Sequence, residues 1–74
     1  MDEDLGKMIF FHRRLSGLTR VQLADLAGVG KTVVFDLEKG KRSVRYDTLL
    51  KVLAALNIRV VFESPLMETY HEAR

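Results

Sequence analysis

The segment from Thr19 to Lys41, TRVQLADLAGVGKTVVFDLEKGK, constrains the fold most strongly, because two short helical patterns meet there at a Gly-Val-Gly junction. Thr19, followed three residues later by Gln22, fits a capping box and predicts a helix that begins at Arg20. Gly28 can take the left-handed conformation that ends a helix without a steric penalty. Only about one turn of chain then separates the two helices, so they are expected to cross at a steep angle.

The second helix of this segment is predicted to bury one edge and to present its start to the outside. Val34 and Leu37 stand three residues apart, which is the spacing of one buried helix edge. Ala24 offers the small side chain that a close crossing of the two helices requires. The first turn, with Lys31 and Thr32, then projects from the body, where a helix can enter the major groove of DNA.

The same positions resemble a known family. Counted from Arg20, Ala24 is fifth, Gly28 ninth, Val34 fifteenth and Leu37 eighteenth, a pattern typical of the Cro and phage-repressor (XRE-type) family of helix-turn-helix proteins. The flanking stretches GLT, LEKGK and TLLKVLAALNI are also similar to that family, so the resemblance covers roughly residues 5–58. Two positions depart from it: Arg20 replaces the usual Gln, and Gly30 replaces the usual Ser or Thr cap, which weakens the start of the second helix.

The resemblance implies an all-α fold, with a four-helix repressor-like domain over residues 1–57 that binds double-stranded DNA. The expected base contacts in the major groove are Lys31, Thr32, Phe35 and Asp36. The expected phosphate contacts on either side of the groove are Thr19, Arg20, Gln22, Lys41 and Arg42. Three of these have a second interpretation: Asp36 can pair with a neighbouring Lys, Phe35 can pack under the following loop, and Gln22 is explained equally well by its cap.

The first helix is predicted to bury one face, formed at helical spacing by Leu5, Met8, Ile9 and His12. Gly6 in that helix predicts a close approach by another backbone. Phe10 lies nearly opposite the buried face, where it is either a stray exposed aromatic or a contact for a dimer or another partner. In repressors of the resembled kind an Arg and a Glu at the positions of Arg13 and Glu38 form an ion pair, so the resemblance implies that pair here.

Residues 58–63 are predicted to form a short β-strand that pairs across a homodimer. The stretch IRVVF is β-branched and aromatic, and its expected dimer contacts are Ile58, Val60, Val61 and Phe62. A lone strand cannot satisfy its own backbone, so the economical partner is the same strand of a second subunit, antiparallel across a two-fold axis. The tail, residues 64–74, is either a short helix with Leu66, Met67 and Tyr70 on one side or a mobile terminus.

Charge is distributed unevenly along the chain. The net charge of +2 hides a basic middle, since residues 7–45 hold nine Lys or Arg against three Asp or Glu, while the remaining residues hold three against seven. A basic middle favours a surface that binds a polyanion. Seventy-four residues make one small domain, which is expected to gain stability by pairing with another chain.

The sequence argues against nucleotide binding, metal binding and a membrane span. The stretch GVGKT resembles the end of a phosphate-binding loop, but Asp25 stands where that loop needs Gly, and a helix precedes it instead of a strand. The chain has no cysteine, and His12 and His71 have no ligand set around them, so neither a metal site nor a cofactor is expected. No apolar run approaches a membrane span, and the acidic start is unlike a signal peptide. We therefore expect a non-enzymatic protein in the bacterial or phage-infected cytoplasm, associated with the nucleoid.

Three functions remain for such a chain. A helix-turn-helix followed by a dimer strand resembles the HipB-type antitoxins, which implies a homodimeric repressor of its own operon that reads a palindromic operator and binds a HipA-like kinase toxin. Free-standing phage-type or metabolic repressors end similarly, and the sequence does not decide between the two. A protein-interaction adaptor that does not read DNA is the third possibility, and the basic loop GKRSVR argues against it.

Overall fold

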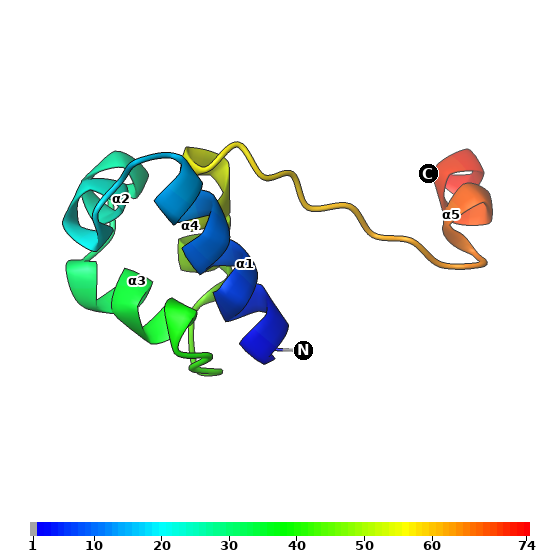
Figure 1. Ribbon diagram of the computed structural model, residues 1–74. Coiled ribbons are helices and arrows are strands. Elements are labelled where there is room, and N and C mark those ends of the chain that lie inside the picture. Colours follow the sequence, from blue (N-terminus) through cyan, green and yellow to red (C-terminus); the bar gives the residue numbers. More distant parts are fainter. Residues whose placement is uncertain (1) are drawn as a thin grey trace.

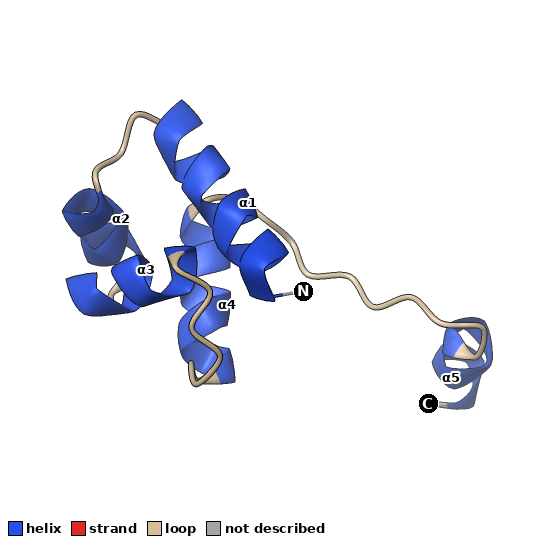
Figure 2. Cartoon of the chain, turned by 60° about the horizontal axis from the view of Figure 1, so that its bottom comes forward, coloured by secondary structure: helices blue, strands red, loops and turns tan. Residues whose placement is uncertain are grey.

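The computed structural model describes residues 2–74, which form five helices and no strand (Figure 1). The helices are α1 (Asp2–Leu15), α2 (Arg20–Ala27), α3 (Lys31–Glu38), α4 (Tyr46–Ala55) and α5 (Met67–Ala73). The first four make up one body, and Met1, where the domain predicted over residues 1–57 begins, lies outside the described residues. α5 stands apart from that body at the end of an extended loop (Figures 1 and 2).

One apolar cluster joins the four helices of the body. Its buried members recur at helical spacing on the inward face of each helix: Ile9, Leu23, Ala24, Val34, Leu37, Val52, Leu53 and Leu56. α2 packs against both α3 and α4, while α1 packs against α3. The body, which we define as residues 2–58, therefore buries its apolar faces within itself.

Gly6 is the point where α1 meets the end of α3. A Cβ atom at this position would lie 2.6 Å from the carbonyl oxygen of Leu37 and 2.8 Å from that of Glu38. Neither backbone can retreat without disturbing its own helix, so only glycine fits here. The predicted close approach of another backbone at Gly6 is confirmed.

The chain leaves the body as an extended loop, and the strand predicted for residues 58–63 is not present in the single chain (Figure 2). Ile58 still belongs to the body, because its N–H donates to the Leu53 carbonyl at 2.9 Å and its side chain packs against the core. Beyond it Val60, Val61 and Phe62 are exposed. A strand forms only beside another strand, and no segment of residues 2–74 runs alongside this one. We call residues 59–66 the arm.

The tail is helical over α5, which decides between the two predictions for residues 64–74 in favour of a short helix. Leu66 and Tyr70 are exposed, and none of the residues of α5 is buried. Within residues 2–74 no helix combines the length and the apolar character needed to cross a membrane.

Candidate nucleic-acid interface

The turn between α2 and α3 forms as the sequence predicts. The N–H of Gln22 donates to Oγ1 of Thr19 at 3.1 Å, and the N–H of Thr19 donates to Oε1 of Gln22 at 2.8 Å, so the capping box is complete. Gly28 ends α2 in the left-handed conformation, with φ of 73°. Gly30 is the N-cap of α3 and makes no side-chain hydrogen bond, as expected where Ser or Thr is replaced.

The start of α3 is presented to the outside. Val34 and Leu37 are buried against the core, as predicted, which turns the opposite side of the helix outward. Lys31 and Thr32, in the first turn, are both exposed. α3 therefore offers a free polar end that a groove can receive.

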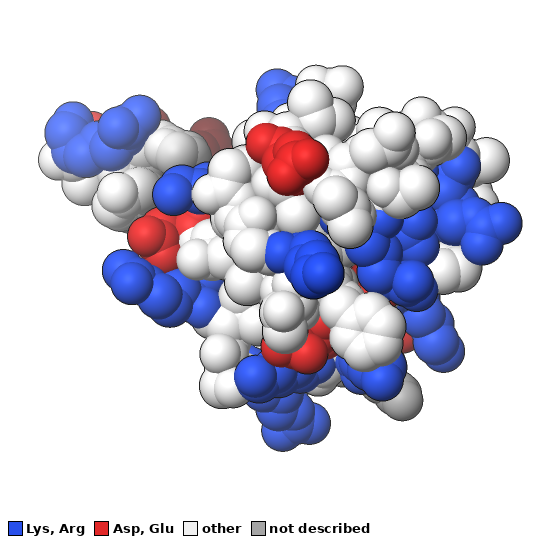
Figure 3. Space-filling view, turned by 90° about the vertical axis from the view of Figure 1, so that its left-hand side faces the viewer, with Lys and Arg blue, Asp and Glu red and all other residues white. Residues whose placement is uncertain are grey.

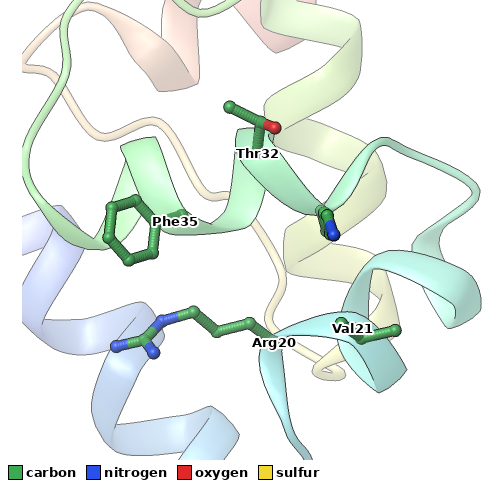
Figure 4. A pocket seen from close by; sticks show the side chains of 5 residues that line it. Arg20, Val21, Thr32 and Phe35 are labelled. Carbon is green, nitrogen blue, oxygen red and sulfur yellow. The ribbon is translucent and has the colours of Figure 1, made fainter.

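A shallow hollow of about 270 Å³ separates the starts of α2 and α3, lined by Arg20, Val21, Lys31, Thr32 and Phe35 (Figure 4). Figure 4 shows the Arg20 side chain running from α2 towards the Phe35 ring on α3. Four predicted contacts thus share this surface: the phosphate contact Arg20 and the base contacts Lys31, Thr32 and Phe35. Sequence reasoning missed Val21, although its place directly after the first residue of α2, away from the buried Leu23, gave a signal.

Two cations lie over the Phe35 ring. The Arg20 guanidinium carbon is 5.2 Å from the ring centroid, and the Lys39 ammonium nitrogen is 4.3 Å from it. Such contacts stabilise by about 0.5–1 kcal/mol at exposed sites. The ring therefore holds positive charge beside the start of the groove-facing helix, with Lys39 as a second residue that sequence reasoning did not include.

The ion pair implied between Arg13 and Glu38 is present. The Arg13 Nε donates to Oε2 of Glu38 at 2.6 Å, both side chains are buried, and a second Arg13 nitrogen donates to the Leu18 carbonyl at 2.8 Å. Arg20 adds a bond that the sequence did not predict, from its Nε to Oε1 of Glu38 at 3.0 Å. Glu38 thus fixes an expected phosphate contact, Arg20, against the end of α3.

The remaining predicted DNA contacts lie in the loop after α3, in α3 itself and at the start of α2. The Lys41 ammonium lies 3.4 Å from Oδ2 of Asp36, which is the second interpretation given for Asp36. Such a surface pair contributes only about 0–1 kcal/mol, so DNA phosphates can compete for Lys41. Arg42 is exposed next to it. Thr19 and Gln22 lie at the start of α2, with their side-chain oxygens engaged in the cap.

Basic side chains surround this face. Figure 3 looks onto the side of the molecule that carries α2 and α3 and shows Lys and Arg on several sides of it, with patches of Asp and Glu among them. The predicted contacts Arg20, Lys31, Lys41 and Arg42 all come from these two helices and the loop after α3. The arrangement suits a polyanion with a groove, since cations flank a projecting helix end.

A short helix with an exposed basic start, set on a second helix by a tight glycine turn, defines the helix-turn-helix class of DNA-binding unit. A helix-turn-helix family model matches residues 12–62, and the chain belongs to this XRE-type helix-turn-helix family. The predicted resemblance to the Cro and phage-repressor family is therefore confirmed, and the chain is a DNA-binding transcriptional regulator of that family.

Two relatives align over most of their length. The chain is 32% identical over 62 residues to the uncharacterized HTH-type transcriptional regulator y4mF of Sinorhizobium fredii (strain NBRC 101917 / NGR234), an alignment that covers 84% of this chain and 82% of that protein. It is 31% identical over 58 residues to the control protein C.SmaI of Serratia marcescens, covering 78% of this chain and 69% of that protein.

Proposed function

We propose that this regulator is a repressor that binds a two-fold symmetric operator as a homodimer, with one α3 helix in each of two successive major grooves. The observation that carries the proposal is the exposed first turn of α3, where Lys31 and Thr32 stand beside the Arg20 guanidinium that Glu38 and Phe35 hold in place. Lys31 donates to guanine, Thr32 contacts thymine or accepts a hydrogen bond, and Arg20 grips a phosphate. The names of the two relatives, a transcriptional regulator and a control protein, support a regulatory role.

The arm supplies the dimer contact. Val60, Val61 and Phe62 are exposed in the single chain, and no other strand within residues 2–74 pairs with their extended backbone. Pairing with the same segment of a second subunit satisfies that backbone and covers those side chains in one step. A two-fold ribbon also sets two copies of α3 at a fixed distance, as reading of a palindrome requires.

The proposal is tested by selecting duplexes from a random library and sizing the complexes. We expect an inverted repeat whose half-sites lie about 34 Å apart, bound by two chains. Val60→Pro removes a backbone donor from the ribbon, so the variant should sediment as a monomer and lose about 100-fold or more in operator affinity. Val60→Thr, which keeps the donor and the branched side chain, is the matched control.

Two results would contradict the proposal. A Val60→Pro protein that stays dimeric places the interface elsewhere. A wild-type protein that binds no duplex of any sequence in dilute buffer is an adaptor that does not read DNA.

A second candidate function, the predicted antitoxin role, adds a toxin protein as partner. The observation that favours a protein partner is on the outer side of α1, where Phe11 and Leu15 stand one turn apart and are 57% and 74% exposed. Phe10 is also partly exposed, with the guanidinium carbons of Arg13 and Arg14 at 5.3 and 5.6 Å from its ring. An exposed apolar strip of this kind on α1 is a surface that a protein partner can cover.

The antitoxin role predicts a stable complex with the product of an adjacent gene. Co-expression of the two genes, followed by purification through a tag on the regulator, should recover both proteins from the wild type. The double substitution Phe11→Ala and Leu15→Ala should lose the second protein and keep operator binding. Recovery of the regulator alone from the wild type would leave a free-standing repressor.

A further inference from the structure

Beyond the arm, α5 presents an apolar side that nothing in the body covers. Met67 and Tyr70 lie one turn apart in α5, and Leu66 precedes them, with Leu66 and Tyr70 exposed at 72% and 59%. The opposite side of the helix carries Glu68 and Glu72. The helix is thus two-sided, which is the pattern of a helix that lies on a surface.

The body has an apolar hollow that is open on the α1 and α4 side. Leu5 and Met8 of α1 line it together with Leu49, Leu50 and Leu53 of α4, and it measures about 390 Å³. The arm begins at its edge, since Val60 and Phe62 line it as well. A second hollow of about 380 Å³, between the arm and α5, shares Val60, Val61 and Phe62 with the first. One continuous apolar surface therefore runs from the body along the arm to α5.

The geometry of a two-fold ribbon decides which body α5 meets. In an antiparallel pair, all residues beyond the axis lie on the side of the partner. With the axis near Val60, the end of the arm and α5 follow the axis and lie on the partner's side, while Ile58 of the partner subunit leads back into the partner's body. The ribbon therefore carries α5 towards the body of the second subunit, which holds the α1–α4 hollow.

The area of the ribbon alone is too small for a stable dimer. An aromatic side chain carries about 150–250 Å², so Phe62 with two valines supplies on the order of 300 Å² for each subunit. Stable interfaces bury about 800 Å² for each partner. The missing interface area can come from the apolar side of α5 and the hollow that it would cover. That side is formed by Leu66, Met67 and Tyr70.

We infer that each α5 packs its Met67 and Tyr70 side into the α1–α4 hollow of the second subunit, so that the two chains exchange their tails across the ribbon. The inference rests on the ribbon proposed above and adds a second contact to it. The hollow is proposed to be filled by a second copy of this chain, because the hollow, the arm and α5 form one continuous apolar surface. Two copies related by a two-fold axis can each cover this surface of the other.

The absence of cysteine from the chain makes cross-linking a direct test. Leu50→Cys and Tyr70→Cys are made separately, mixed, allowed to exchange subunits and treated with an oxidant or a short bis-maleimide. Only a contact between α5 of one subunit and α4 of the other joins the two cysteines in different chains. The mixture should give at least about tenfold more covalent dimer than either variant alone. A mixture of Lys31→Cys with Tyr70→Cys is the matched control and should give none, because Lys31 lies on the DNA-facing side.

Two further variants separate this inference from the ribbon itself. Val61→Cys lies next to the two-fold axis and should cross-link with its own copy whenever the ribbon forms. Cross-linking of Val61→Cys without any from the Leu50→Cys and Tyr70→Cys mixture leaves the ribbon standing and overturns the α5 contact. Absence of both overturns the ribbon as well.

A measurement without cross-linking completes the test. Met67→Ser with Tyr70→Ser, in the full chain, should raise the dimer dissociation constant at least about tenfold in sedimentation, with helical content of the body unchanged. An unchanged dissociation constant would show that α5 contacts another protein or solvent instead of the second subunit. A further variant carries Leu50→Cys and Tyr70→Cys in the same chain, and a cross-link that forms only within that chain would show that α5 packs on its own body. Either result contradicts the exchange.

Discussion

The body and the segment beyond it contain similar apolar residues in opposite surroundings. In the body Ile9, Leu23 and Val34 are fully buried, whereas beyond it Val61 and Leu66 are 71% and 72% exposed. Burial of apolar surface stabilises by about 25 cal/mol per Å². The buried residues of the body contribute this free energy to folding of the single chain, whereas the exposed residues beyond the body do not. Apolar sequence therefore predicts that a surface will be covered, and only the topology shows whether the covering surface belongs to the same chain.

The largest loss of stability is expected when the buried carboxylate of Glu38 is removed, which tests whether contacts within the body alone hold it folded. Glu38→Ala leaves the buried Arg13 guanidinium without its charge partner and frees Arg20, so the free energy of unfolding should fall by about 3–5 kcal/mol. Urea unfolding followed by circular dichroism measures the change. Asp36→Ala, two residues earlier, removes only an exposed pair with Lys41 and should change stability by less than about 1 kcal/mol. Equal losses in the two variants would show that the buried network does not hold the body together.

A smaller loss is expected from one methyl group. Gly6→Ala places a Cβ against two α3 carbonyl oxygens, and this overpacking should cost about 1–3 kcal/mol despite the better helix propensity of alanine. Thermal unfolding provides the measurement. Gly30→Ser is the control, because a Cβ there meets nothing within 4 Å and the hydroxyl restores a cap, so this variant should be neutral or slightly stabilised. A stabilised Gly6→Ala protein would refute the contact between α1 and α3.

The smallest effect on the body is expected from the arm. Phe62→Ala should change the unfolding free energy by less than about 0.5 kcal/mol when measured on dilute, monomeric protein, because the ring is 64% exposed. Leu23→Ala, at a fully buried position, should cost about 2–5 kcal/mol under the same conditions. At higher concentration Phe62→Ala should weaken the dimer. A large loss in the monomer would show that the arm packs on its own body, and the contrast between the two regions would disappear.

Local signals in the sequence predicted the structure of the helix-turn-helix, α2 and α3, well. The capping box of Thr19 with Gln22, the left-handed Gly28 and the buried pair Val34 with Leu37 each depend on residues within one or two turns, where spacing determines contact. The pair of Arg13 with Glu38 joins residues 25 positions apart, and no spacing rule predicts it. The resemblance to a family supplied that pair.

The remaining features depend on packing that the sequence does not display. The contacts of Arg20 with Glu38 and with the Phe35 ring follow from how α2 crosses α3, which brings together side chains 15 or more positions apart in the chain. Lys39 lies four residues after Phe35, so helical spacing alone could have predicted that contact. The strand predicted for residues 58–63 rested on their β-branched and aromatic composition, but a strand needs a neighbouring strand, and the single chain has none over residues 2–74. The helix at α5 was left open because seven residues carry too little periodicity to decide.

The central claim is that the first turn of α3 reads base edges, and Lys31→Ala tests it most directly. Fluorescence anisotropy with a selected operator and a random duplex of equal length, across a range of salt concentrations, gives the specificity ratio and the salt slope. We expect the specificity ratio to fall about tenfold or more, because one good base contact is worth about 1–3 kcal/mol, while the salt slope changes little. Lys41→Ala, the matched phosphate control, should weaken both duplexes alike and lower the slope by about 0.9. Equal losses on both duplexes with Lys31→Ala would place Lys31 on the DNA backbone and contradict base reading by the first turn of α3.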